Sequence, residues 1–402
     1  MKTIVFVRKN ANPRMYNQVY ALKQSKNYKL ILLCRTFDEI MLGKFREVFD
    51  EIICYQPLDL QKHGLRQDVS SSFPMHLMKY VINHYIDPHI GRMSERIRLP
   101  YILRQLEPDV CVCQGTEYKI ITQVMKNTKC PIILDVHDGS PTKGIENLSE
   151  SIREKEKYIF EHASGIIHRG PPEIEINYYK EHGYKITCPV LQHIDCCNKA
   201  FFVNKNTKKL SSEDGELHLV GMGGGYSSLL YTQLIKKLTK QKIHYHLYCV
   251  PHSIISPIVF KEYKKLNKNE KYFHLEKAVP FDKVQEEIAK YDFGTHLAPH
   301  EYLRNYSYIY KKVSFGNRPL TYLESGLPTI ISEGIGLQKE FAEENGIGFG
   351  VKDNEIDNIY EMIKKYDYDK AKENVLKTRE KFLIDNYVER LVKFYDEVIQ
   401  RG

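Results

Sequence analysis

Short apolar runs alternate with longer amphipathic stretches along this chain, and this alternation constrains the fold more than any other feature. It is typical of strands joined by crossover helices, which together build a parallel sheet. In the first half it predicts strands over 3–7, 29–34, 51–54, 109–113, 131–136 and 165–168, with helices such as 117–127 and 149–162. In the second half it predicts strands near 216–221, 243–249, 272–276, 292–297 and 328–332. The expected fold class is therefore α/β with two doubly wound parallel sheets.

The 402 residues exceed what one ordinary core accommodates, so two domains of roughly 200 residues or fewer are expected. Residues 205–215 are polar and turn-rich, and the alternation restarts after them, which indicates a domain boundary. The predicted domains are thus 1–204 and 205–378, followed by a helical tail over 379–402. One helical stripe of this tail carries Val388, Leu391, Tyr395 and Val398. That stripe must be buried against another part of the protein.

The composition excludes several classes of protein. Lys and Arg number 59 against 51 Asp and Glu, and the net charge of +8 suits phosphate-bearing ligands but is too small for a dedicated nucleic-acid binder. No apolar run reaches the 18 residues of a membrane-spanning helix, and the first strand is too short for a signal peptide. Cysteines such as Cys34 and Cys111 lie in apolar runs without metal-site spacing. We expect a cytoplasmic protein with no metal and no nucleic-acid partner.

An insertion is expected over 62–104, because the strands at 51–54 and 109–113 are further apart than one crossover helix requires. Seven basic residues minus three acidic ones give this stretch a net charge of +4. One helix face would carry Met78, Val81, Ile82, Tyr85 and Ile86. Two interpretations stay open. The stretch is either a core helix with a solvated basic face or, over 73–104, an interfacial patch that docks on anionic lipid.

The segment 315–332, FGNRPLTYLESGLPTIIS, carries the richest set of local signals. Pro319 suits the first turn of a helix, so the loop before it is expected to present unpaired backbone N–H groups. With Gly316 and Asn317 this loop can hold a phosphate oxyanion. Arg318 would add a charge-assisted contact.

Two other predicted strands end in residues suited to a ligand site. The glycine loop GMGGG ends in Gly223, Gly224 and Gly225, which would let the backbone approach a diphosphate, although a plain tight turn has the same sequence. His137 and Asp138 follow the strand at 131–136, at the carboxyl edge of its sheet. Asp138 is a candidate general base toward an acceptor hydroxyl. The alternative for this pair is a structural hydrogen bond.

Taken in order, these segments resemble the GT-B glycosyltransferases of the large family 4 type. The helix motif of that family matches here at Arg318, Tyr322, Leu323, Gly326, Leu327 and Pro328. Weaker matches follow in the family's order at 12–34, 108–119, 131–138, 193–202, 218–228, 277–299 and 385–399. The resemblance implies a GT-B fold, in which two Rossmann-like domains face a cleft and a C-terminal helix returns to the first domain.

The resemblance also implies an activity. A sugar would pass from a nucleotide-diphosphate sugar to a hydroxyl of a glycan or lipid-linked acceptor, in cell-envelope polysaccharide or glycoconjugate synthesis at the inner membrane face, without metal or cofactor. His137 would contact the donor sugar. The residues expected at the donor are Gly223, Gly224, Gly225, Val279, Arg304, Lys312, Gly316, Asn317, Arg318, Thr321 and Glu324. A nucleotide-sugar 2-epimerase of the same fold and a non-catalytic GT-B subunit are the alternatives.

The chain departs from the family pattern at two acidic positions. The family's E-x7-E pair falls on Val313 and Thr321, and the second Glu of that pair binds the donor ribose. Glu324, three residues after Thr321 on the same helix face, would reach the ribose instead. The basic residues that often follow the glycine loop are also absent from 221–234, so Arg304, Lys311, Lys312 or Arg318 would supply the positive charge. The stereochemical outcome stays open.

Overall fold

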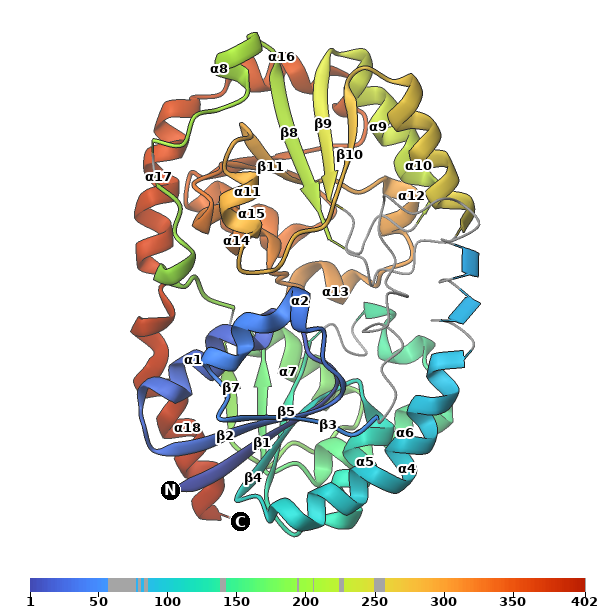
Figure 1. Ribbon diagram of the computed structural model, residues 1–402, viewed down its shortest axis with the longest axis vertical. Coiled ribbons are helices and arrows are strands. Elements are labelled where there is room, and N and C mark those ends of the chain that lie inside the picture. The colour runs from blue at the N-terminus through green and yellow to red at the C-terminus, as the bar shows by residue number, and fades with distance from the viewer. Residues whose placement is uncertain are drawn as a thin grey trace.

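The computed structural model contains two α/β domains, drawn in Figure 1 with the first domain below and the second above. It describes residues 1–56, 77–78, 81–82, 86–137, 142–193, 195–204, 206–223, 228–248 and 257–401. The two parallel sheets predicted from the alternation are both present.

The first sheet has seven parallel strands within the described residues, in the order β3-β2-β1-β4-β5-β6-β7. They are β1 (Lys2–Asn10), β2 (Tyr28–Thr36), β3 (Glu51–Cys54), β4 (Val110–Gln114), β5 (Ile132–Asp135), β6 (Gly165–His168) and β7 (Val190–Gln192). Its helices are α1 (Arg14–Gln24), α2 (Glu39–Leu42), α4 (Asp87–Leu106), α5 (Tyr118–Asn127), α6 (Glu150–Glu161) and α7 (Pro172–Glu181). The sequence analysis missed β7, because three residues give too short an apolar run.

The second sheet has six parallel strands within the described residues, in the order β10-β9-β8-β11-β12-β13. They are β8 (Leu217–Met222), β9 (Ile243–Tyr248), β10 (Phe273–Glu276), β11 (Phe293–His296), β12 (Thr329–Ser332) and β13 (Gly348–Val351). Its helices are α8 (Ser211–Asp214), α9 (Leu230–Lys240), α10 (Pro257–Asn269), α11 (Val284–Ile288), α12 (His300–Leu303), α13 (Tyr308–Val313), α14 (Arg318–Glu324), α15 (Gly336–Glu344) and α16 (Ile359–Lys365). Strand β13, which contains two glycines, was also missed.

Both faces of each sheet are covered by a hydrophobic core. In β1, Ile4 and Phe6 belong to one buried cluster, while Val5 and Val7 belong to another on the opposite face. This alternation follows from the two-residue period of a strand. A doubly covered parallel sheet explains why its strands are almost wholly apolar.

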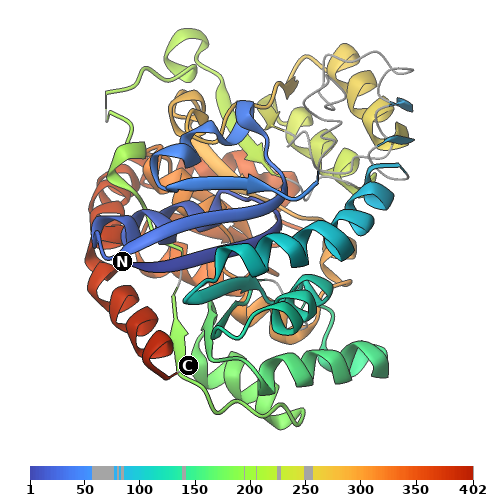
Figure 2. The ribbon, with the colours of Figure 1, turned by 60° about the horizontal axis from the view of Figure 1, so that its bottom comes forward.

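Two C-terminal helices, α17 (Tyr368–Lys381) and α18 (Val388–Arg401), run along one side of the molecule from the second domain to the first, as both views show (Figures 1 and 2). Leu391, Tyr395 and Val398 are buried in the core beside the first sheet, and Gln18 donates a hydrogen bond to the Tyr395 hydroxyl at 2.8 Å. The predicted burial of this stripe is confirmed.

Helix α4 occupies the later part of the predicted insertion. Leu99 and Leu103 are buried against the first sheet, whereas Met93, Ile97 and Tyr101 are 64%, 65% and 62% exposed. The helix therefore has one core face and one exposed apolar stripe. On the face predicted from Met78 to Ile86, Met78, Val81 and Ile86 are exposed and Ile82 is part-buried, while Tyr85 lies outside the described residues. Among the helices that are described, none combines the length and apolarity needed to span a bilayer.

Candidate functional site

The two domains touch where the carboxyl ends of their strands face each other. Ser307, just before α13, donates a backbone hydrogen bond to the carbonyl of Thr142 at 3.0 Å. Gly170 follows β6, and a Cβ built on it would lie only 2.5 Å from the Val313 Cβ. Glycine at 170 thus permits the close approach of α13 to the first domain. In doubly wound folds this edge is where ligands bind.

A buried ionic cluster lies at this edge of the first sheet. Asp135, fully buried at the end of β5, pairs with Arg8 of β1 at 2.9 Å and with Arg169 at 3.0 Å. Arg169 also donates from Nε to the Asp195 carboxylate at 3.1 Å. Burial raises the pKa of Asp135 while His137, Arg169 and Arg8 lower it, and the balance holds this pKa well below its ordinary value. The cluster is therefore charged and rigid.

His137 is held within this cluster. Its Nε2 lies 3.0 Å from Asp135 Oδ2 and 2.9 Å from Arg169 Nη2, and its Nδ1 lies 3.4 Å from Arg14 Nη1. Burial, and then the charge of Arg169, lower the pKa of His137. The ring is neutral near pH 7, and both of its nitrogens face protein groups. The structural partner of His137 is Asp135. The predicted partner, Asp138, lies outside the described residues.

Arg14, the first residue of α1, links the two domains. Besides facing His137, its Nε lies 3.8 Å from Asp195 Oδ2. Its Nη2 lies 3.5 Å from where a Cβ on Gly316 would stand, and Gln338 Nε2 lies 3.3 Å from the same point. The predicted phosphate loop of the second domain therefore meets a first-domain guanidinium. A side chain at 316 would crowd this junction.

On the second sheet, Gly223, Arg318 and His296 lie together. Gly223 has φ +106°, which favours glycine, and a Cβ there would stand 3.1 Å from Arg318 Nε. Gln338 accepts a hydrogen bond from His296 Nδ1 at 2.7 Å. Burial, and then the charge of Arg318, lower the pKa of His296 well below its ordinary value. The structure thus brings the predicted Gly223 next to the predicted Arg318.

Other predicted donor residues are more dispersed. Gly224 and Gly225 lie outside the described residues. Arg304 is exposed after α12, and Lys312 is exposed on α13 with its Nζ 4.6 Å from the centre of the Tyr308 ring. Thr321 is part-buried on α14 and donates to the Asn317 carbonyl at 3.2 Å.

Glu324 has two protein partners. It is buried, and its carboxylate accepts hydrogen bonds from the Asn198 backbone N–H at 2.8 Å and from Gln285 Nε2 at 2.7 Å. Burial raises the pKa of Glu324 to about 7. The carboxylate therefore ties the segment joining the domains to α11, and its role at a ribose remains a prediction.

The segment around Val279, a part-buried residue expected at the donor, is anchored on the first domain. Phe281 donates a backbone hydrogen bond to the Met41 carbonyl at 3.2 Å. Its ring centre lies 5.2 Å from those of Tyr16 and Phe45. This aromatic contact fixes the segment beside the junction of the domains.

Sequence reasoning missed most of the charged residues at this junction, namely Arg8, Asp135, Arg169 and Asp195, which are buried, and Arg14, which is part-buried. A usable signal existed, because Arg8, Asp135 and Arg169 lie within or just after otherwise apolar strands. A charge in such a position is costly to bury unless it is paired.

Comparison with known proteins gives a family match for part of the chain and a structural match for the overall fold. The sequence profile of the family "Glucosyltransferase 3-like, C-terminal domain" matches residues 233–394, less than half of the chain. No curated protein matches the sequence.

Three solved structures illustrate the likeness of the fold. HepE from Anabaena, in complex with UDP-glucose, has a TM-score of 0.67 at 12% identity over 98% of this chain and 100% of that one. Sucrose-phosphate synthase from Thermosynechococcus elongatus has a TM-score of 0.63 at 13% identity over the whole of both chains. A protein from Listeria monocytogenes, described as a proposed UDP-N-acetylglucosamine 2-epimerase, has a TM-score of 0.55 at 11% identity over 100% and 98%. The chain therefore has the GT-B fold.

Proposed function

We propose that this chain is a glycosyltransferase that moves a sugar from a nucleotide-diphosphate sugar to a hydroxyl of a glycan or lipid-linked acceptor. The observation that carries the proposal is the meeting of two sets of residues. His137 and Arg14 come from the first domain, and Gly316, Arg318 and Gly223 come from the second. In such a site the acceptor enters from one domain and the donor from the other.

Charge stabilisation of the leaving diphosphate supports this reading. Helix α14 has only seven residues, so its dipole is a weak source of positive charge. Arg318 beside the Gly223 backbone, with Arg14 across the junction, supplies two guanidinium groups suited to phosphate oxygens. These charges would stabilise the diphosphate that forms as the glycosidic bond breaks.

The buried cluster around Asp135 gives the acceptor side its rigidity. His137 is held at Nε2 by Asp135 and Arg169, and its Nδ1 would contact the donor sugar near the anomeric carbon in place of its 3.4 Å contact with Arg14. We assign Asp138 as the candidate base for the acceptor hydroxyl. The reaction proposed here needs no metal or other cofactor.

The proposal predicts that a nucleoside diphosphate stabilises the folded chain. UDP at about a hundred times its dissociation constant should raise the unfolding midpoint by about 3 °C, because it binds only the native state. Thermal-shift assays with UDP, GDP, ADP and TDP would identify the nucleotide. UMP should give a smaller shift, since it lacks the β-phosphate that Arg318 would contact. If none of the four diphosphates shifts the midpoint at millimolar concentration, the proposal fails.

A nucleotide-sugar 2-epimerase is the second candidate, and the fold similarity to the Listeria protein favours it. The two activities differ in their need for an acceptor. Incubation of the chain with the stabilising nucleotide sugar, without acceptor, should leave the sugar configuration unchanged for a transferase. Detection of the 2-epimer among the products would show that the chain is an epimerase.

We further propose that α4 holds the protein on anionic membranes, near a lipid-linked acceptor. Its exposed stripe of Met93, Ile97 and Tyr101 is accompanied by exposed Arg92, Arg96, Arg98 and Arg104. An apolar stripe beside basic side chains suits insertion at the boundary between headgroups and acyl chains.

Vesicle flotation tests this membrane contact. Recovery should be much higher with phosphatidylserine-containing vesicles than with neutral ones. Replacing Arg92, Arg96 and Arg98 by Ala should weaken binding by roughly 100-fold, at about 1 kcal/mol for each basic residue. Replacing exposed Lys261, Lys265 and Lys268 of α10 removes the same charge and serves as the control. Equal recovery with both vesicle types contradicts the proposal.

A further inference from the structure

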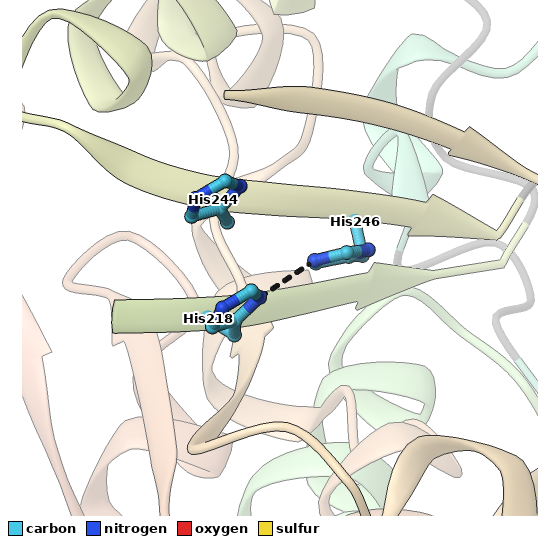
Figure 3. A group of neighbouring side chains, drawn as sticks. All are labelled: His218, His244 and His246. Carbon is cyan, nitrogen blue, oxygen red and sulfur yellow. Dashed lines mark hydrogen bonds between the residues drawn. The ribbon is translucent and has the colours of Figure 1, made fainter. Parts of the chain in front are cut away.

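Four histidines gather on one face of the second sheet, away from the site described above. His218 lies on β8 and His244 and His246 on β9, as Figure 3 shows, and all three are buried. His274 of β10 stacks beside His246 at 4.3 Å between ring centres. Positions 218 and 223 lie at opposite ends of β8, about 16 Å apart at the usual rise of a strand. The cluster therefore sits at the edge opposite to the candidate donor site.

Each of the three histidines in Figure 3 has one ring nitrogen on a carboxylate. His218 Nε2 lies 3.0 Å from Asp214 Oδ2, and His246 Nδ1 lies 2.8 Å from Glu276 Oε1. His244 Nε2 lies 2.5 Å from a Glu216 oxygen. An ionised carboxylate only accepts hydrogen bonds, so these three nitrogens carry the protons of the neutral rings.

This proton assignment leaves two ring nitrogens facing each other with no proton between them. The remaining nitrogens, His218 Nδ1 and His246 Nε2, lie 3.0 Å apart and face each other, at the dashed line in Figure 3. Both would present lone pairs, because two neutral imidazoles hold two protons and both protons are donated outward. The contact therefore calls for a cation between or beside the two nitrogens.

We propose that His218, His244 and His246 bind one divalent transition-metal ion of the zinc type. One ligand atom from each lies within 4.8 Å of the other two. Zinc–nitrogen bonds of about 2.0–2.1 Å require a tighter set. The rings of His218 and His244 stack with an interplanar angle of 6° and 4.4 Å between centres, so one of them would turn for both nitrogens to face the ion. Imidazole ligands select zinc, copper or nickel over magnesium or calcium.

The surrounding carboxylates fit this assignment. A metal-bound histidine almost always donates its other N–H to a carboxylate or carbonyl, which fixes the ring and makes the ligand more basic. All three rings have such a carboxylate here, from Asp214, Glu216 and Glu276.

The alternative to a metal ion is a proton shared between His218 Nδ1 and His246 Nε2. A proton would satisfy these two rings alone, whereas a metal ion would also engage His244. His244 Nδ1 lies 2.8 Å from His274 Nε2, so the ion would displace His274 from this nitrogen. The ion would join β8 to β9 at the edge of the sheet opposite to the donor site. Its expected effect is to stabilise the second domain, with nucleotide binding unchanged.

Zinc titration of the full chain tests this inference. After chelator treatment and dialysis, with a phosphine reductant, Zn²⁺ should bind with a stoichiometry of one and raise the unfolding midpoint by several degrees. His218→Gln and His246→Gln should each weaken this site by at least 100-fold. His162→Gln, which removes an exposed histidine of the first domain, should have no effect. Co²⁺ should give the strong visible absorption of a site with nitrogen ligands and low coordination number.

Three results would overturn the proposal. One is the absence of stoichiometric Zn²⁺ binding, which leaves the shared proton as the occupant. The second is equal affinity in His218→Gln, His246→Gln and the unmodified chain, which places the ion elsewhere, for example on cysteines. The third is Zn²⁺ binding without any rise in the midpoint. The UDP shift is measured separately on the same variants, so a failed metal site leaves the proposed transferase activity untouched.

Discussion

Arg318→Ala is expected to lower kcat/KM for sugar transfer by roughly 30- to 1000-fold. A charge-assisted contact to the leaving diphosphate in a partly dry site is worth on the order of 2–4 kcal/mol, and it grows as the glycosidic bond breaks. Arg318 lies beside Gly223 and close enough to His296 to lower its pKa, so its charge lies at the carboxyl ends of β8 and β11. Initial rates with the nucleotide sugar identified by thermal shift would measure the loss.

Two further variants make this test specific. Arg318→Lys should recover part of the activity, because it restores a point charge without the bidentate geometry of a guanidinium. Lys240→Ala removes an exposed charge of the same domain, at the end of α9, and should change the rate little. Near-normal turnover and UDP affinity in a folded Arg318→Ala protein would show that the donor site lies elsewhere.

Arg169→Met is expected to cost about 3–5 kcal/mol of unfolding free energy. Arg169 is buried between Asp135 and Asp195, and its removal leaves two buried carboxylates short of their shared partner. Breaking a buried ion pair from one side is costly because the remaining charge stays desolvated. Urea unfolding followed by circular dichroism would give the free-energy change.

Matched variants distinguish the cost of breaking the buried ion pairs from the effect of replacing any arginine by methionine. Arg304→Met exchanges the same residue types at an exposed position and should lie within about 0.5 kcal/mol of the unmodified chain. Asp195→Asn keeps the shape of the side chain and leaves the pair of Arg169 with Asp135 intact. It should therefore lower the unfolding free energy less than Arg169→Met does. Its unfolding can still be measured if the Arg169→Met protein does not fold. A loss below about 1 kcal/mol for Arg169→Met would mean that water, not Arg169, balances these carboxylates.

Prediction from sequence worked best where one short pattern decides the structure locally. Strand β3 and helix α5 were placed almost to the residue, and Pro319 and Gly326 mark the start and end of α14 as expected. Strands β7 and β13 were missed, since a few residues flanked by polar or glycine positions carry little periodic signal.

The candidate site was only partly predictable. Gly223 and Arg318 were both named from local motifs, and the fold places them side by side. Arg14 and Arg169 were not predicted. Each is a single charged residue in its own segment, and its partners come from distant parts of the chain. The histidine cluster was missed for the same reason. His218, His244, His246 and His274 lie on three strands, and no metal-ligand spacing in the sequence joins them.

The sequence by itself determined the alternation of strands and helices in two α/β units and the buried face of the last helix. Periodicity, turn residues and chain length encode these features over short distances, and they suffice because each element must bury its apolar face. Tertiary structure alone decided that Asp135 pairs with Arg8, Arg169 and His137, and that Arg14 reaches Gly316 of the other domain. Such pairings depend on how strands far apart in the chain meet at one sheet edge, and desolvation makes them strong only after that edge has formed.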